Sequence, residues 1–434
     1  MKASWKWNLR HLFKKIGVRS ALYSLLGVMT ALIGLLLKDY VPESLSGAVG
    51  ADSVDKILGI LSSSMLAVTT FSLSTMVGAY GSASSGATPR ATQLLIQDTT
   101  TQNVLSSFIG SFLFSVVGII ALQMGVYGER GKVVLFIATL AVLLFVVYNL
   151  LRWINHLTQF GRLGETTSRV EKVTEDALKR TAELPYLGAR PRHEAPLLPA
   201  HASAILGEQS GYVQFIDLAG LANILKSPGK SIYCEVVPGS FVGPNSVLAY
   251  GIGLDDAERE RVKNAFSIAI QRSFEQDPRF GLCALSEIAS RALSPAVNDP
   301  GTGIDVISRG TRLLINFARE KRRAELEHRQ QAVVEDRSFY PVDPRFNNLY
   351  CAEPTAADFF DDFFIPIGRD GAGLIEVMIT LLKALKRLAE NDPELYGPLA
   401  KKHGEMIFKR AEKAMPLKED LQRLEEKLAS LKAL

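Results

Sequence analysis

The chain has 434 residues, a formal net charge of +4 and 47% hydrophobic residues. Charged residues are sparse in residues 20–151 and gather after Arg152, which is typical of a membrane region joined to a polar region. A net charge this small gives no support to nucleic-acid binding. The three cysteines (Cys234, Cys283 and Cys351) are widely separated, have no metal-ligand spacing and fit a reducing cytoplasm.

Four apolar segments follow one another after a basic stretch at residues 1–20. None of them contains Asp, Glu, Lys or Arg, and a helix needs about 20 apolar residues to cross a bilayer. We therefore predict four transmembrane helices within residues 21–151, at 21–37, 57–80, 104–127 and 133–151. The first segment is followed by no small-residue cleavage site, so we interpret it as a retained span rather than a signal peptide.

The charges that flank the segments predict their orientation. Positive charge before the first segment favours a cytoplasmic N-terminus, although Arg130 and Lys132 in the predicted tight outer turn at 128–132 oppose this rule. The fourth segment then returns to Arg152 and delivers the rest of the chain to the cytoplasm. Trp5, Trp7 and Trp153 would lie near the inner interface.

The second segment is rich in hydroxyl groups. Ser63, Thr70 and Ser74 share one helical face, with Ser62 and Thr69 as further pore-lining candidates. Hydroxyls in a pore could replace the hydration shell of an ion. Alternatively, Ser and Thr can bond their own helix, and small residues permit close helix packing. Both interpretations stay open at this point.

The absence of charge inside the segments argues against proton-coupled pumping and voltage sensing. Four helices rarely enclose a pathway alone, so a pore predicts a homo-oligomer. The Gly- and Ser-rich stretch at 81–90 is interpreted as a flexible connector, with a re-entrant pore-mouth element as the alternative.

The polar region divides into three parts. Residues 152–200 are predicted as a helical extension, to about Lys179, and a Pro-rich linker. Residues 201–253 are predicted as a small β-barrel-like subdomain, and residues 254–434 as a mainly helical subdomain. The expected strands are 212–216, 231–237 and 247–250.

The densest polar constellation lies between Arg272 and Asp305. Its members could form a ligand or cation site, since oxygen ligands suit hard cations. They could equally be helix caps and an i, i+4 ion pair. The candidates are Asp277, Glu287, Arg291, Asn298 and Asp299.

The rest of the polar region offers no catalytic motif. The six histidines are scattered, and no nucleophile, base and acid arrangement can be identified. We therefore predict no catalytic residue, metal or cofactor, and a non-enzyme is favoured. Leucine-rich faces from Leu374 and from Leu417 predict C-terminal helices, packed on their own domain or on another subunit.

Several motifs give the chain a resemblance to a known family. They are Ser84-Ser85 with Pro89-Arg90, Gly211-Tyr212-Val213-Gln214, Pro238-Gly239, Gln276-Asp277-Pro278, and Arg291-Ala292-Leu293-Ser294-Pro295 through Asn298-Asp299-Pro300. In these the chain resembles the bacterial membrane-protein family named domain of unknown function 2254, with Ser273 and Gly301 as departures from its pattern. The resemblance implies a multi-pass bacterial inner-membrane protein, with the lipid bilayer as its partner, and supplies no activity.

Three functional hypotheses follow. The leading one is an oligomeric channel or channel-like pore with a cytoplasmic gating or sensing domain. The rival is a membrane-anchored enzyme or ligand-binding sensor that acts at the Asp277–Asp299 region. A scaffold for partner proteins is the third.

Overall fold

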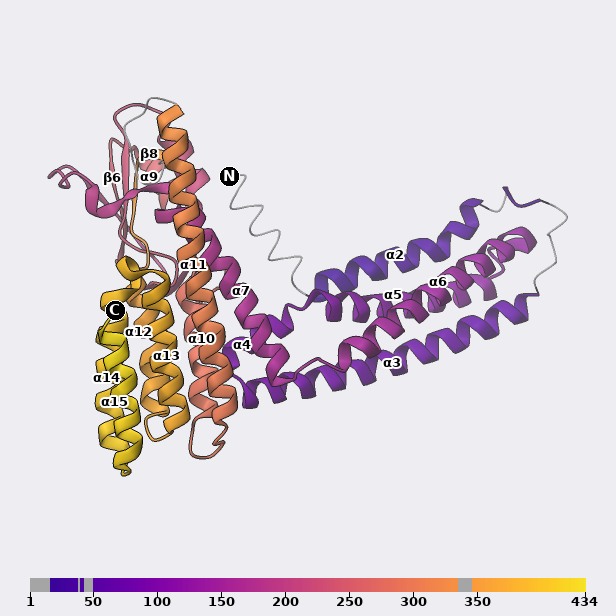
Figure 1. Ribbon diagram of the computed structural model, residues 1–434. Helices are drawn as coiled ribbons and strands as arrows, with labels where there is room; N and C mark the ends of the chain where they lie inside the picture. Colours follow the sequence, from indigo (N-terminus) through magenta and orange to yellow (C-terminus); the bar gives the residue numbers. More distant parts are fainter. Residues whose placement is uncertain (1–15, 38–39, 43–49, 335–345) are drawn as a thin grey trace. The chain divides into compact units, whose positions relative to one another are not determined.

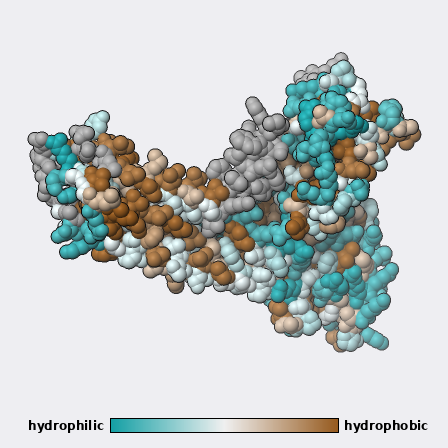
Figure 2. All heavy atoms as spheres, turned by 180° about the vertical axis from the view of Figure 1, so that it is seen from behind, coloured by the Kyte–Doolittle hydropathy of each residue, from teal (hydrophilic) through white to brown (hydrophobic). Residues whose placement is uncertain are grey.

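The computed structural model describes residues 16–37, 40–42, 50–334 and 346–434. These residues fall into two compact units. We call residues 16–85 and 89–166 the membrane unit, and residues 86–88 and 167–434 the α+β unit. Hydrophobic side chains gather on the surface of the membrane unit, whereas hydrophilic side chains dominate the surface of the α+β unit (Figure 2).

The membrane unit is built from helices that lie lengthwise beside one another (Figure 1). Three of the four predicted spans are confirmed as helices long and apolar enough to cross a membrane, at Asp52–Gly86, Thr99–Gln123 and Gly128–Leu157. In the first predicted span the apolar helix is shorter, Gly17–Ile33, so a fourth span is not confirmed. The helices are α2 (Ile16–Leu37), α3 (Ala51–Gly86), α4 (Pro89–Ile96), α5 (Thr99–Gln123) and α6 (Gly128–Leu157).

Two glycines bring α2 and α5 into close contact. A Cβ atom on Gly27 would lie 2.3 Å from the carbonyl oxygen of Gly110, and one on Gly110 would lie 2.6 Å from that of Tyr23. Side-chain hydrogen bonds reinforce the contact: Arg19 donates to Asn103 over 2.7 Å, and the Ser20 and Ser106 hydroxyls lie 3.1 Å apart. Small residues that let backbones approach are the usual basis of helix packing in lipid.

Three sequence interpretations near the membrane unit are wrong. The tight turn predicted at 128–132 lies instead at 124–127, and residues 128–132 begin α6. The Gly- and Ser-rich stretch, expected to be a flexible connector from Gly81, is helical as far as Gly86, because extending an established helix avoids the cost of nucleation. The fourth apolar segment was expected to continue as one helix to about Lys179. It ends at Leu157, and α7 (Leu163–Glu183) begins after a turn in which Gly161 has φ +77°. A positive φ cannot continue an α-helix.

The α+β unit contains two sheets. The strands predicted at 212–216 and 247–250 are confirmed, and the strand predicted at 231–237 is shorter, because it ends at Cys234. One sheet has the order β1-β8-β4-β6-β2 and the other β5-β3-β7. Three of these strands, β1, β7 and β8, come from outside residues 201–253, so the sheets combine segments that are far apart in the sequence. The predicted barrel-like subdomain is therefore not confirmed. The strands are β1 (Ala189–Pro191), β2 (Ser203–Leu206), β3 (Gly211–Ile216), β4 (Ser231–Cys234), β5 (Phe241–Val242), β6 (Val247–Ile252), β7 (Phe266–Ala269) and β8 (Phe346–Cys351).

Helices make up the rest of the α+β unit (Figure 1). The short 3-10 segments Pro185–Gly188 and Arg192–Glu194 follow α7. Buried phenylalanines of α12, including Phe359 and Phe363, fill the helical core, where Gly310 leaves space for the Phe363 ring. The remaining helices are α8 (Leu218–Ile224), α9 (Asp256–Lys263), α10 (Pro278–Ala292), α11 (Pro300–Val334), α12 (Ala356–Asp370), α13 (Ile375–Asn391), α14 (Pro393–Ala414) and α15 (Lys418–Lys432).

The leucine-rich C-terminal helices pack on their own unit, as one of the two alternatives predicted. On α13, Met378, Leu381, Leu385 and Leu388 are fully buried. On α15, Leu424, Leu428 and Leu431 are buried, and the last two of these lie against Gly404 of α14. Leu417 precedes α15 and stays exposed.

Candidate functional site

Helix α3 has a buried face and an open face. The residues of the buried face recur at helical spacing and pack on the other helices of the membrane unit: Val54, Leu58, Leu61, Met65, Ser72, Met76 and Ala83. Ser63, Thr70 and Ser74 lie on the opposite, exposed face, and Ser62 and Thr69 are half-buried at its edges. The five pore-lining candidates therefore lie on the open side of α3 or along its borders.

Hydroxyl groups on this face donate to carbonyls of their own helix. Ser63 donates to Gly59 over 3.0 Å, Thr69 to Met65 over 2.6 Å, and Thr70 to Leu66 over 2.9 Å. Such bonds let a hydroxyl lie in lipid at little cost. They also leave the oxygen free to accept from, or coordinate, whatever lies outside. Pore lining stays a prediction.

Glycines extend the open face of α3. A Cβ atom added at Gly59, Gly78 or Gly81 would meet nothing within 4 Å. The packing of this one chain therefore does not require glycine at these positions, in contrast to Gly27 and Gly110. Among the described residues, nothing packs close enough to these three glycines to require their small size.

In the α+β unit, Asp277 is a buried structural carboxylate. It caps α10 by accepting from the backbone N–H of Phe280, and it pairs with the Arg272 guanidinium through contacts of 2.7 and 2.9 Å. Gly239, with φ +93°, lies so close that a Cβ there would be 2.3 Å from Oδ2 of Asp277. Burial raises the pKa of Asp277, and the hydrogen bond and charge of Arg272 oppose that rise.

Asp299 and Asn298 form the turn between α10 and α11. Asn298 has φ 51°, a left-handed conformation that Asn tolerates well. Asp299 accepts from the backbone N–H of Thr302 over 3.0 Å and from its hydroxyl over 2.6 Å, as an N-cap does. These hydrogen bonds from Thr302 lower the pKa of Asp299.

The five ligand candidates do not share one site. Helix α10 has 15 residues, so it is about 22 Å long, and Asp277 and Asp299 lie beyond its opposite ends. Between them, Glu287 accepts from the Thr88 hydroxyl over 2.8 Å, and Arg291 is exposed at the C-terminal end. Within the described ranges, no group of three or more His, Cys, Asp or Glu side chains could hold a metal ion.

The structure also joins residues that sequence spacing left apart. His156 at the end of α6 lies 2.7 Å from the carboxylate of Asp98, which caps α5 and also accepts from the Thr101 hydroxyl. Neighbouring strands β4 and β8 place Cys234 beside Cys351, and their hydrogen bond together with burial raises the pKa of Cys351 well above its usual value. No local signal could have found either pair, since their members are 58 and 117 positions apart (156−98 and 351−234).

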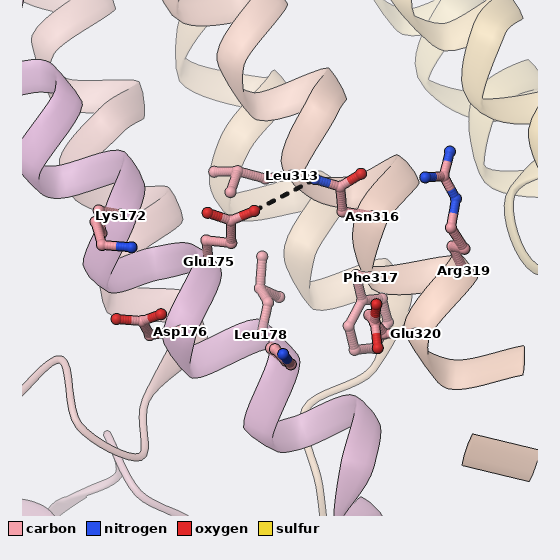
Figure 3. Close-up of a pocket in the computed structure, with 10 residues that line it drawn as sticks. Lys172, Glu175, Asp176, Leu178, Leu313, Asn316, Phe317, Arg319 and Glu320 are labelled. Atoms are coloured by element: carbon pink, nitrogen blue, oxygen red, sulfur yellow. Dashed lines mark hydrogen bonds between the residues drawn. The ribbon is translucent and has the colours of Figure 1, made fainter. Parts of the chain in front are cut away.

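A cavity of about 420 Å³ lies between α7 and α11. Its lining mixes both signs of charge, with Lys172 and Lys179 beside Glu175 and Asp176. Figure 3 shows the Glu175 carboxylate directed toward Asn316, whose side-chain nitrogen donates to it over 3.4 Å. The charges of this cavity therefore largely compensate one another, which gives it no marked preference for a charged ligand.

The family model described as "Predicted membrane protein (DUF2254)" matches residues 14–387. The chain belongs to this family of membrane proteins. It is also 25% identical over 262 residues to the uncharacterized proteins Rv1290c of Mycobacterium tuberculosis and Mb1321c of Mycobacterium bovis. The matched part is 58% of this chain and 50% of each relative, so the match spans about half the length of these curated proteins. No solved structure matches the chain.

Proposed function

We propose that the protein is a channel-like pore of the bacterial inner membrane, formed by several copies that meet along the open face of α3. The observation that carries this proposal is the contrast on α3 between a buried, mainly apolar stripe and an open face on which hydroxyls and glycines lie among exposed apolar side chains such as Leu66 and Val77. A helix that met only lipid would gain nothing from small residues there, whereas helices that pack closely or line a narrow pathway would.

The hydroxyl groups on the open face of α3 support a pathway that is itself uncharged and through which cations can pass. Ser63 and Thr70 donate their protons to their own helix, so their outward oxygens are acceptors. Rings of such oxygens can replace part of the hydration shell of a cation, as backbone carbonyls do in other pores. The apolar segment holds no ionisable residue, which excludes a charge-ring mechanism from the proposal.

The proposed topology places the α+β unit in the cytoplasm with both chain ends, and gives α2 the role of a fourth span. A single turn after α6 leads into α7, which continues into the α+β unit. We assign that unit the role of gate or sensor, because a motion of α7 would reach the membrane helices through this turn.

The test is current through planar bilayers that contain the purified full chain, recorded with several cations and anions and under voltage and tension. The variant Ser63→Ala/Thr70→Val/Ser74→Ala removes hydroxyls from the open face and is expected to lower or abolish the current. Thr139→Val is the matched control, because that hydroxyl is buried in α6 and donates to Leu135. A chain that is silent under every condition and monomeric in detergent would refute the proposal.

A further inference from the structure

A groove between α11 and α13 is lined by positive charge without compensating carboxylates. Its volume is about 480 Å³, within the range of small-molecule sites. Four cationic side chains line it: Arg312 and Arg319 from α11, and Lys383 and Arg387 from α13. Hydroxyl and amide groups, among them Thr311 and Thr380, complete a lining that contains no carboxylate.

Three of the four cations have no carboxylate partner among the described residues: Arg319, Lys383 and Arg387. Arg312 pairs with Glu171, which also accepts from Arg309 over 2.6 Å, so this acid is already shared. Arg319 also borders the neighbouring cavity, yet Figure 3 shows its guanidinium directed away from Glu175 and Asp176. Elsewhere in the unit, Arg272 and Arg279 each hold a bidentate carboxylate. The groove is therefore a local excess of positive charge.

The spacing of the cations indicates what would neutralise them. Arg319 lies seven positions after Arg312, which is about 10 Å along α11, and Arg387 lies four positions after Lys383, which is about 6 Å along α13. Packed helices lie about 8–10 Å apart, so the charges surround an elongated space rather than a point. A single phosphate would reach one end of it, whereas a chain of linked phosphates would reach both helices.

We propose that this groove binds a soluble small molecule that carries several linked phosphate groups, such as a nucleoside triphosphate or an inorganic polyphosphate. Guanidinium and ammonium groups are the side chains that hold phosphate oxygens best. Thr311 and Thr380 donate their hydroxyl protons to Ile307 and Glu376 carbonyls, so the cations must supply the recognition of the anion. The inference goes beyond the proposed pore and does not depend on it, because binding needs no conduction.

The test uses the full chain purified in neutral detergent, with inorganic triphosphate as the probe and isothermal titration calorimetry as the measurement. Triphosphate should bind at least about tenfold more tightly than orthophosphate, since each additional charge-assisted contact contributes about tenfold or more in affinity. A short-chain anionic phospholipid, titrated in parallel, distinguishes a lipid headgroup from a soluble ligand. Lipid binding without triphosphate binding would overturn the proposal, and so would equal affinity for triphosphate and orthophosphate.

A charge-matched pair of variants locates the site. Arg319→Ala/Lys383→Ala/Arg387→Ala should weaken triphosphate binding by about a hundredfold or more. Removing three exposed lysines outside the groove, in Lys226→Ala/Lys413→Ala/Lys427→Ala, changes the net charge equally and should weaken it by less than about threefold. Arg319→Lys, which keeps the charge, should retain most of the affinity. Equal losses in the two triple variants would show that binding follows net charge, and the assignment to this groove would fail.

Discussion

Glycine occurs both at the contact between α2 and α5 and on the open face of α3, but its surroundings differ between the two regions. At the contact, Gly27 and Gly110 are required because each lies against the other helix's backbone. On α3, Gly59, Gly78 and Gly81 touch nothing that a side chain would displace. The small residues of the first region are explained inside the chain. No contact among the described residues explains those of the second region, and the proposed pore depends on them.

The α+β unit shows the same difference between satisfied and open groups. Arg272 and Asp277 satisfy each other beside Gly239 and need nothing further. Three cations between α11 and α13, Arg319, Lys383 and Arg387, have no such partner in the part of the chain that the structure describes. Polar or small residues are therefore informative about function where no contact within the chain explains them. The predictions below compare such residues with others whose contacts are satisfied.

The largest expected effect is at the α2–α5 contact. Gly27→Leu drives a side chain into the Gly110 carbonyl, which only movement of the two backbones can relieve. We expect a loss of about 3 kcal/mol or more in unfolding free energy, because overpacking against backbone cannot be relaxed by rotamer changes. Thermal and denaturant unfolding in detergent measure it. A variant as stable as the parent chain would show that the close contact is not formed.

The next effect is at the Arg272–Asp277 pair. Asp277→Ala leaves a guanidinium only 21% exposed without its partner and removes the cap of α10. The expected loss is about 3 kcal/mol. Asp299→Asn is the control, since Asn is an equally good cap on a more exposed turn, and it should stay within about 0.5 kcal/mol. If both substitutions cost the same, Asp277 is not the buried structural group described above.

A smaller effect depends on pH and arises at His403 of α14. Burial lowers the pKa of His403 below its usual value of 6.5, and Lys402 and Arg410 add to this shift while Asp361 opposes it. A depressed histidine pKa means that the unfolded chain binds more protons below pH 6.5. The stability that neutral His403 contributes is therefore complete above pH 6.5 and is lost as the pH falls from 6.5 toward the lower folded-state pKa. His403→Phe should flatten the pH dependence of unfolding in this window, whereas exposed His201→Phe should not.

The smallest effect on the single chain is expected on the open face of α3. Gly78→Leu places a side chain into open space, so the unfolding free energy should change by less than about 0.5 kcal/mol. Association of copies in detergent or lipid, measured by analytical ultracentrifugation, should weaken nonetheless. Unchanged association would mean that this face meets lipid, and the contrast with Gly27 would lose its functional meaning.

Local patterns in the sequence predicted the elements that depend on neighbouring residues. The long apolar segments predicted α3, α5 and α6, since the lack of water in a bilayer demands uninterrupted apolar helices. A β-rich composition predicted three strands, and leucine spacing predicted the buried face of α13. The helix break at Gly161 was missed because the residues on either side favour a helix and only a positive φ ends it.

The candidate residues show where sequence reasoning stops. Ser63, Thr70 and Ser74 were placed on one face by helical periodicity alone, but only the packing of Leu58 and Leu61 determined that this face is the open one. Asp277 and Asp299 were grouped by their closeness in the chain, and the helix between them holds them apart. The basic groove could not be predicted from the sequence, because its cations come from helices about 70 positions apart. No local pattern shows which charges remain unpaired.

The sequence by itself determined that this is a membrane protein with a large polar region, because burial in lipid imposes a composition on every residue of a span. It also offered helix capping as one of two interpretations of Asp277 and Asp299, since a cap depends on hydrogen bonds within a few positions. Tertiary structure alone decided which glycines are enclosed, which hydroxyls face outward and which cations lack a partner. Those properties depend on contacts between segments far apart in the chain, and they are the properties on which the proposed pore and the proposed phosphate groove depend.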